Sequence, residues 1–307
     1  MTRSPGKYFD SELIARISRL ELTARRVVDG FLSGKNKSNR FGFSVEFVEH
    51  REYVPGDDLR HLDWKVLGRL DRYYIKRYEE ETNITSVLIV DSSASMTLGT
   101  GKWTKFEAAA TTASALGYLL NRQRDAVGLA LFDEELRAFH SPSVRLASLA
   151  GLITKLNEVR PKGETGLLST VQRVSMETSR RSLVILISDL FLPSSELSAA
   201  LQFLQFHGHE AIVLHVLDNS ELTFPFGENT LFRGLEDGKE LLAEPQRLRE
   251  RYLQQIDGFL KDVRKTCDSF AFDYQLVNTH DSLSTTLATL LALRNRRRPL
   301  TRKGTSH

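Results

Sequence analysis

The sequence predicts an α/β protein with a doubly wound, mainly parallel sheet, preceded by an N-terminal helix and a small β-containing segment. From residue 84 onward, short apolar runs such as VLIV and LVILIS alternate with longer segments whose apolar residues recur at helical spacing. Strands that are apolar throughout are typical of a parallel sheet covered by helices on both faces. With 307 residues and 41% hydrophobic residues, the chain is long enough to bury such a core.

The order of the elements follows from this alternation. Runs of β-branched and apolar residues predict strands at residues 85–91, 125–133, 182–189, 210–218 and 270–279. Helical spacing predicts helices at residues 105–123, 144–159, 167–179, 195–208, 244–269 and 282–296. A short strand at 136–140 is expected to pair with the strand before it through a turn at 133–135. Glycines and weak periodicity at 222–243 predict an insertion of turns or short strands.

The first part of the chain has a different character. Helical spacing predicts a helix between residues 10 and 31, and a polar, glycine-bearing loop follows at 33–42. Residues 43–81 are dense in aromatic residues and in charges of both signs, so short strands and turns are expected there. The chain is accordingly divided into residues 1–83, a doubly wound domain at 84–295, and a basic tail at 296–307 that is expected to be disordered.

Composition narrows the class of protein. The net charge of +3 is too small to indicate nucleic-acid binding, and much of the local excess lies in RNRRRPLTRK near the C-terminus, for which a solvated state is expected. The single cysteine, Cys267, excludes an internal disulfide and fits a reducing compartment. Apolar runs such as SLVILIS are far shorter than the roughly 20 residues of a transmembrane helix. The N-terminal residues lack a signal-peptide core, and we therefore expect a cytoplasmic protein.

Polar residues follow two of the predicted strands where each strand ends. Asp91 ends one strand, with Ser93 and Ser95 shortly after it, and Asp189 ends another. Ligands of doubly wound sheets bind at the carboxyl ends of strands, so both aspartates reach one rim if their strands are neighbours. Thr165 adds a hydroxyl from a glycine-containing loop before a helix. Hydroxyls and two carboxylates are hard oxygen donors that suit Mg²⁺ or Mn²⁺ in near-octahedral geometry.

These residues also have other interpretations. Ser and Asp after strands most often cap helices, which explains any one of the five residues but not all of them together. A serine hydrolase requires a Gly-x-Ser-x-Gly elbow, which neither Ser93 nor Ser95 has. A phosphotransferase with Asp91 as nucleophile is expected to have Asp-x-Asp, but Ser93 takes the second position. Metal-assisted hydrolysis remains an alternative, because an ion held by two acids activates water.

Two further patterns do not support catalysis or nucleotide binding. GTGKWTK at residues 99–105 fails as a P-loop, because Met96 stands where the first glycine is required and Trp103 follows the lysine. Histidines in or near strands are more often structural than metal-ligating, and the pair at the end of the predicted helix at 195–208 is interpreted as a capping pair. These histidines are His140, His215, His207 and His209.

The motif DSSAS with a later Thr and Asp resembles the metal-ion-dependent adhesion site of von Willebrand factor A-type domains, which have a Rossmann-like sheet. The upstream segment EFVEHREYVPGDDLRHLDW resembles the signature of the bacterial domain-of-unknown-function fifty-eight family. That family carries Glu-Phe, Arg-x-Tyr, Pro-Gly-Asp-Asp-x-Arg and Leu-Asp-Trp ahead of such a domain, and DAVGLALFD fits its Asp-x-Val-Gly-Leu strand. The matches run from Glu46 to Asp189, about half of the chain. Gly166 stands where relatives often have an acid.

The resemblance implies a metal-dependent protein-binding module that is not an enzyme. In such sites Ser93, Ser95 and Thr165 would ligate Mg²⁺ or Mn²⁺ directly, and Asp91 and Asp189 would do so directly or through water. A vacant position then accepts a carboxylate from a partner protein. Because family members are often encoded beside an AAA+ ATPase of the MoxR type, such an ATPase is the expected partner. The polar residues of the signature block, Glu46 to Lys65, are interpreted as an internal salt-bridge network, with a partner-binding surface as the alternative.

Overall fold

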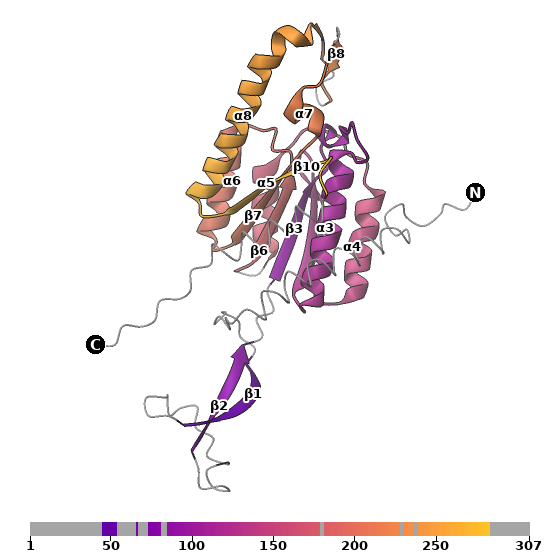
Figure 1. Ribbon diagram of the computed structural model, residues 1–307. Helices are drawn as coiled ribbons and strands as arrows, with labels where there is room; N and C mark the ends of the chain where they lie inside the picture. The colour runs from indigo at the N-terminus through magenta and orange to yellow at the C-terminus, as the bar shows by residue number, and fades with distance from the viewer. Residues whose placement is uncertain are drawn as a thin grey trace, which may run out of the picture. The chain divides into compact units, whose positions relative to one another are not determined.

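The computed structural model describes the chain over residues 45–53, 66, 73–80, 85–178, 181–227, 230–235 and 239–282 (Figure 1). The chain divides into two units, one formed by residues 36–84 and the other by the remaining residues. The helix expected at residues 10–31, the loop at 33–42, the closing helix beyond residue 282 and the basic tail lie outside the described residues. The division at residues 83 and 295 stays a prediction.

The smaller unit contains an antiparallel hairpin. β1 (Val45–Glu52) pairs with β2 (Tyr74–Glu80), and the register shifts between Phe47 and Glu49. Where the strands end, the Tyr53 amide donates to the Tyr73 carbonyl at 2.8 Å. The β-containing segment expected here is confirmed, whereas the part of the signature block at residues 54–65 lies outside the described residues.

The larger unit is built on a sheet whose strands run in the order β10-β7-β6-β3-β4-β5. Every neighbouring pair in this sheet is parallel except β4–β5, which is antiparallel. The strands are β3 (Thr85–Asp91), β4 (Ala126–Phe132), β5 (Leu136–Ser143), β6 (Leu183–Ser188), β7 (Glu210–Leu217) and β10 (Asp273–Asn278). This is the doubly wound, mainly parallel sheet expected from the sequence, and the predicted α/β fold class is confirmed.

Helices cover both faces of this sheet (Figure 1). α3 (Lys105–Arg122) and α4 (Leu146–Glu158) lie on one face. The opposite face is covered by α5 (Leu167–Glu177), α6 (Ser194–Phe206) and α8 (Pro245–Ser269). Side chains alternate along β3, so Val87 and Ile89 join the core formed with α5, α6 and α8, whereas Leu88 lies toward α3.

The first helix after β3 is fixed at its beginning by a capping box. The Thr104 hydroxyl accepts from the Glu107 amide at 3.1 Å, and the Glu107 carboxylate accepts from the Thr104 amide at 3.0 Å. Small residues, mostly alanines, let α3 approach the sheet closely, and its residues are buried from Lys105 to Ala110 except Glu107. This packing places the N-terminal turn of α3 beside the carboxyl ends of the strands.

The insertion between β7 and α8 contains a short helix and a hairpin. α7 (Asn219–Thr223) leads to β8 (Thr230–Arg233), which pairs antiparallel with β9 (Glu240–Ala243). The prediction of turns and short strands missed α7. Within the described ranges, no helix has the length and apolarity that crossing a membrane requires.

Candidate metal centre

The two predicted acidic ligands lie at the ends of neighbouring strands. β3 pairs directly with β6, so Asp91 at the end of β3 and Asp189 just after β6 share one rim of the sheet. Both side chains are fully buried. Asp91 accepts hydrogen bonds from the Ser93 amide at 2.8 Å and from the Ser188 hydroxyl at 2.6 Å. The second of these bonds ties the end of β3 to the residue next to Asp189.

The two predicted serine ligands lie together on the turn after β3. A short 3-10 helix, η2 (Ala94–Thr97), begins directly after Ser93, and the Ser93 and Ser95 hydroxyls lie 3.1 Å apart. Both side chains are buried. The turn therefore presents two neighbouring hydroxyl oxygens beside the Asp91 carboxylate.

The Thr165 loop is hydrogen-bonded to this serine turn through the backbone. The Ala94 amide donates to the Gly163 carbonyl, and the Lys162 amide donates to the Ser92 carbonyl, both at 2.9 Å. Within the described part of the chain, the buried Thr165 Oγ1 atom has no hydrogen-bond partner. A buried hydroxyl is normally satisfied, so this one has a free hydrogen-bonding or ligating position for a water molecule or an ion.

Gly166 allows the loop to approach the turn between β4 and β5. Its amide donates to the Asp133 carbonyl at 2.7 Å, and a Cβ atom on Gly166 would lie 2.2 Å from the Glu134 carbonyl oxygen. Any side chain at this position is sterically excluded with this backbone. Close packing against the Glu134 backbone therefore requires glycine at residue 166.

The five predicted residues form an electrostatically unfavourable group without a cation. Burial, and next the charge of Asp189, raise the pKa of Asp91 to about 7, although hydrogen bonds from Ser188 and Ser93 act in the opposite direction. A cation bound by both carboxylates would remove this repulsion. The described residues contain no group of three or more His, Cys, Asp or Glu side chains suited to a metal, and the candidate set combines two carboxylates with three hydroxyls. The orphaned Thr165 hydroxyl and the oxygen-only donors fit Mg²⁺ or Mn²⁺.

A buried lysine that was not among the predicted site residues contacts Asp189. Lys105, the first residue of α3, is fully buried, and its Nζ atom donates to Asp189 Oδ2 at 2.7 Å and to Glu221 Oε1 at 2.8 Å. Burial alone would lower the pKa of Lys105, but the charges of Asp189 and Glu221 outweigh it and raise that pKa. Helical spacing places Lys105 on the same face as Ala108 and Thr112, which are buried. Its acidic partners come from distant segments and are not indicated by any local pattern.

His215 fixes the backbone at Asp189. Its Nε2 atom lies 2.8 Å from the Asp189 carbonyl oxygen, which only accepts hydrogen bonds, so Nε2 carries the proton. Nδ1 then accepts from the Tyr274 hydroxyl at 3.1 Å. Burial lowers the pKa of His215 to about 4, and the ring is neutral at pH 7. The structural role expected for this histidine agrees with these contacts.

Asp218 directly follows β7 and lies at the same edge of the sheet, at the carboxyl ends of the parallel strands. Its carboxylate accepts from the Thr100 amide and hydroxyl, from the Ser220 amide and hydroxyl, and from the Thr279 hydroxyl. Burial alone would raise the pKa of Asp218, but these hydrogen bonds hold it below its usual range. The carboxylate thus joins the loop before α3 to the ends of β7 and β10.

The fold and this rim define the chain as a doubly wound α/β domain with an oxygen-rich site at the carboxyl ends of its central strands. The family described as "Protein of unknown function DUF58" matches residues 49–258, and the chain belongs to this family.

The chain is also similar to individual relatives and solved structures. The uncharacterized proteins Rv1480 of Mycobacterium tuberculosis (strain ATCC 25618 / H37Rv) and Mb1516 of Mycobacterium bovis are each 26% identical to the chain over 272 residues, which is 85% of this chain and 83% of theirs. Similar solved structures include the conserved hypothetical protein BatB from Bacteroides thetaiotaomicron, with 17% identity, a TM-score of 0.46, and coverage of 69% of this chain and 99% of that one. The SpRpn10 VWA domain has 13% identity, a TM-score of 0.40, and coverage of 73% and 100%.

Proposed function

We propose that this protein is a non-enzymatic protein-binding module whose docking point is a divalent cation, Mg²⁺ or Mn²⁺, at the rim formed by β3 and β6. The observation that carries the proposal is the buried Thr165 hydroxyl, which has no hydrogen-bond partner among the described residues. Its loop is hydrogen-bonded to the turn that bears Ser93 and Ser95. Burial of an unsatisfied hydroxyl is unfavourable, and coordination of a cation would offset that penalty.

The chain's own residues would divide the work of holding the ion. Asp91, Ser93, Ser95, Thr165 and Asp189 would hold it, and the ion when bound would supply an open coordination position for a carboxylate of a partner protein. Ser188 and the Ser93 amide keep the Asp91 carboxylate in place, and His215 fixes the Asp189 backbone. The backbone hydrogen bonds between the two loops set the position of the hydroxyls before any ion arrives.

We further propose a MoxR-type AAA+ ATPase in the cytoplasm as the partner, for which this protein acts as an adaptor. The support for this partner is the family resemblance of the signature segment, together with a docking chemistry that suits acidic side chains. A pull-down from native cells is expected to recover the ATPase in buffer with Mg²⁺ and to lose it with a chelator. Equal recovery in both buffers would count against docking through a metal.

The geometry favours binding over metal-assisted hydrolysis. A hydrolase needs a base within reach of the attacking water. Both ring nitrogens of His215 are already engaged, by Asp189 and Tyr274, and both carboxylate oxygens of Asp91 already accept hydrogen bonds, from the Ser93 amide and the Ser188 hydroxyl. Lys105 is held between two carboxylates as a cation and does not act as a base. Hydrolysis of generic phosphoesters that disappears in Asp189→Ala would reverse this ranking.

A thermal-shift titration with Mg²⁺ or Mn²⁺ tests the proposed site. At about tenfold excess over Kd, the ion is expected to raise the melting temperature of the wild type by about 2–5 °C, because a ligand that binds only the folded state stabilises it. The shift should be absent in Asp91→Ala and in the double variant Ser93→Ala/Ser95→Ala. The matched control Ser169→Ala, on the exposed face of α5, should respond like the wild type. Equal shifts in all four proteins would remove these residues from the metal centre.

A further inference from the structure

Lys105 connects the candidate metal centre to a part of the molecule that lies outside the ligand set. Its Nζ atom bridges Asp189, a candidate ligand, and Glu221, the third residue of α7. The Phe191 ring covers the ammonium, with its centroid 4.8 Å from Nζ. Because lysine carries its charge here in a buried position, its two carboxylate partners are required to keep it stable.

The charges around Lys105 bear directly on cation binding. When an ion is bound and Asp91 is deprotonated, Asp91, Asp189 and Glu221 carry three negative charges and Lys105 one positive charge, which leaves two negative charges for a divalent ion to balance. Lys105 shares the Asp189 carboxylate with any bound cation and opposes that cation electrostatically. Glu221 has the opposite effect, because its negative charge, 2.8 Å from the ammonium, offsets the positive charge that Lys105 presents to a cation.

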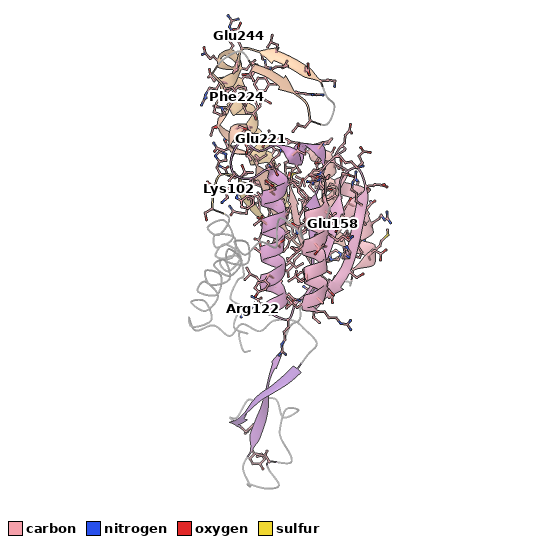
Figure 2. The ribbon with its side chains drawn as sticks, turned by 90° about the vertical axis from the view of Figure 1, so that its right-hand side faces the viewer. Lys102, Arg122, Glu158, Glu221, Phe224 and Glu244 are labelled. Carbon is pink, nitrogen blue, oxygen red and sulfur yellow. The ribbon has the colours of Figure 1, made fainter. Side chains whose placement is uncertain are left out.

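Glu221 also stabilises the beginning of α7, the first element of the insertion between β7 and α8. Its carboxylate accepts from the Asp218 amide at 2.7 Å and completes the capping box that begins α7. α7 ends at Phe224, whose ring stacks on Phe232 of β8 and on Tyr252 of α8. In Figure 2, Glu221 lies nearer the sheet, and Phe224 lies farther from the sheet, toward the β8–β9 hairpin. The contacts therefore run from Asp189 through Lys105 and Glu221 to the β8–β9 hairpin.

We propose that Lys105 and Glu221 are positioning residues that set the cation affinity of the metal centre in opposite directions and couple the ion to the α7–hairpin insertion. This inference rests on the proposed function, because it requires that the rim binds a divalent cation. Linkage makes the coupling reciprocal: if the folded capping box of α7 favours the ion, the ion must stabilise α7 to the same extent.

Two variants separate this role from a purely structural one. Lys105→Met removes the opposing positive charge and should tighten Mn²⁺ binding. Glu221→Gln removes the charge and keeps one of the two acceptor oxygens, which can serve the Asp218 amide. Lys105 then acts on Asp189 alone, and Mn²⁺ binding should weaken. Both variants should lower the stability of the metal-free protein, because each leaves a buried charge less well paired. General damage to the fold would weaken Mn²⁺ binding in both variants. The proposal instead predicts that Mn²⁺ affinity rises in one variant and falls in the other, although both variants are less stable than the wild type.

Isothermal titration calorimetry of the full chain with Mn²⁺ measures these effects. Relative to the wild type, we expect Kd to fall about tenfold or more in Lys105→Met and to rise about tenfold in Glu221→Gln, since charges a few ångströms apart at a buried site interact strongly. The control is Lys102→Met, at an exposed position in the loop before α3. Its Kd for Mn²⁺ should stay within about twofold of the wild-type value, because solvent screens the charge of Lys102. If Lys105→Met does not fold, the direction of the change in Kd for Mn²⁺ in Glu221→Gln tests the proposal: a rise supports it, and a fall or no change contradicts it.

Hydrogen exchange provides the second measurement. Mn²⁺ should slow amide exchange in α7 and the hairpin of the wild type and have a smaller effect there in Glu221→Gln. If the wild type binds Mn²⁺ but the two variants shift Kd in the same direction, or not at all, the inference is wrong while the proposed function stands. If the wild type does not bind Mn²⁺, the proposed function itself fails.

Discussion

Glu196 of α6 caps the N-terminus of α5: its Oε1 atom accepts hydrogen bonds from the Leu167 amide at 2.9 Å and the Leu168 amide at 3.2 Å. Gly166, at the N-cap position, has no side chain for this purpose. The acceptor that α5 needs is therefore supplied from another helix. Because Thr165 directly precedes this cap, the same contact holds the threonine loop at the rim.

Removing this cap should destabilise the protein. Glu196→Ala is expected to lower the free energy of unfolding by about 1–2 kcal/mol, the usual effect of losing an N-cap acceptor and a negative charge near a helix N-terminus. Glu196→Gln keeps the acceptor oxygen and should lose about half as much. Urea denaturation followed by circular dichroism measures both. Wild-type stability in Glu196→Ala would show that the cap contributes nothing.

Replacing Thr165 should separate stability from metal response. Thr165→Val removes a buried hydroxyl that has no partner in the described residues, so the metal-free protein should be as stable as the wild type or more stable. The same change removes a candidate ligand and should abolish the rise in melting temperature on adding Mg²⁺. The control Thr154→Val, at an exposed position in α4, should keep the full response. A full Mg²⁺ response in Thr165→Val would exclude this hydroxyl as a ligand.

Two glycine-to-alanine changes should have opposite effects on stability. Gly166→Ala brings a Cβ atom against the Glu134 backbone and should destabilise the protein by about 2 kcal/mol or more. A Cβ atom added to Gly151 of α4 would instead point into open space, so Gly151→Ala should stabilise by about 0.5–1 kcal/mol. Thermal unfolding of both variants checks the signs, and stabilisation by Gly166→Ala would contradict the close packing of this loop.

His215 should make the protein less stable in mild acid. Its pKa is lowered to about 4 in the folded protein, whereas an unfolded histidine has its usual value near 6.5. Between these two values the unfolded chain binds the extra proton, so stability is full above pH 6.5 and falls as the pH drops toward 4. The loss should reach roughly 3 kcal/mol.

The variant His215→Gln isolates this titration. Glutamine can still donate to the Asp189 carbonyl but does not titrate, so the difference in unfolding free energy between variant and wild type should change in favour of the variant as the pH falls from about 7.5 to about 4.5. Urea denaturation at several pH values in the absence of metal measures it. A difference that is constant across this range would show that His215 does not titrate as its burial implies.

The order of the elements in the larger unit could be predicted from the sequence because apolar periodicity is a local property. The strand ending at Asp91, the helix beginning at Lys105 and the strand before Asp189 were all predicted close to their bounds in the structure. Motif spacing likewise brought the five candidate ligands onto one rim, although their binding of a metal stays a prediction. α7 was missed because its residues are too few to show a period.

The remaining features of the site depend on contacts that no local pattern contains. A lysine at the start of a helix normally extends into solvent, and only the packing of α3 against the sheet makes Lys105 a buried partner of Asp189 and Glu221. The hydrogen bonds of Asp218 likewise require Thr100 and Thr279 to come from distant segments. Gly166 has no explanation in its local sequence either, because the constraint on it comes from the Glu134 backbone.

The residues at this edge of the sheet are far apart in sequence, so the ribosome synthesises them at different times. Asp91 meets Ser188 across 97 residues of sequence, and Lys105 meets Glu221 across 116. During synthesis, the first strand and helix emerge with an acid and a lysine whose partners do not yet exist. Contacts between such distant residues form slowly, because the chain must close long loops to make them. We therefore expect the candidate metal centre to form late in folding, and a chain truncated before β7 to expose the charges that the complete protein buries.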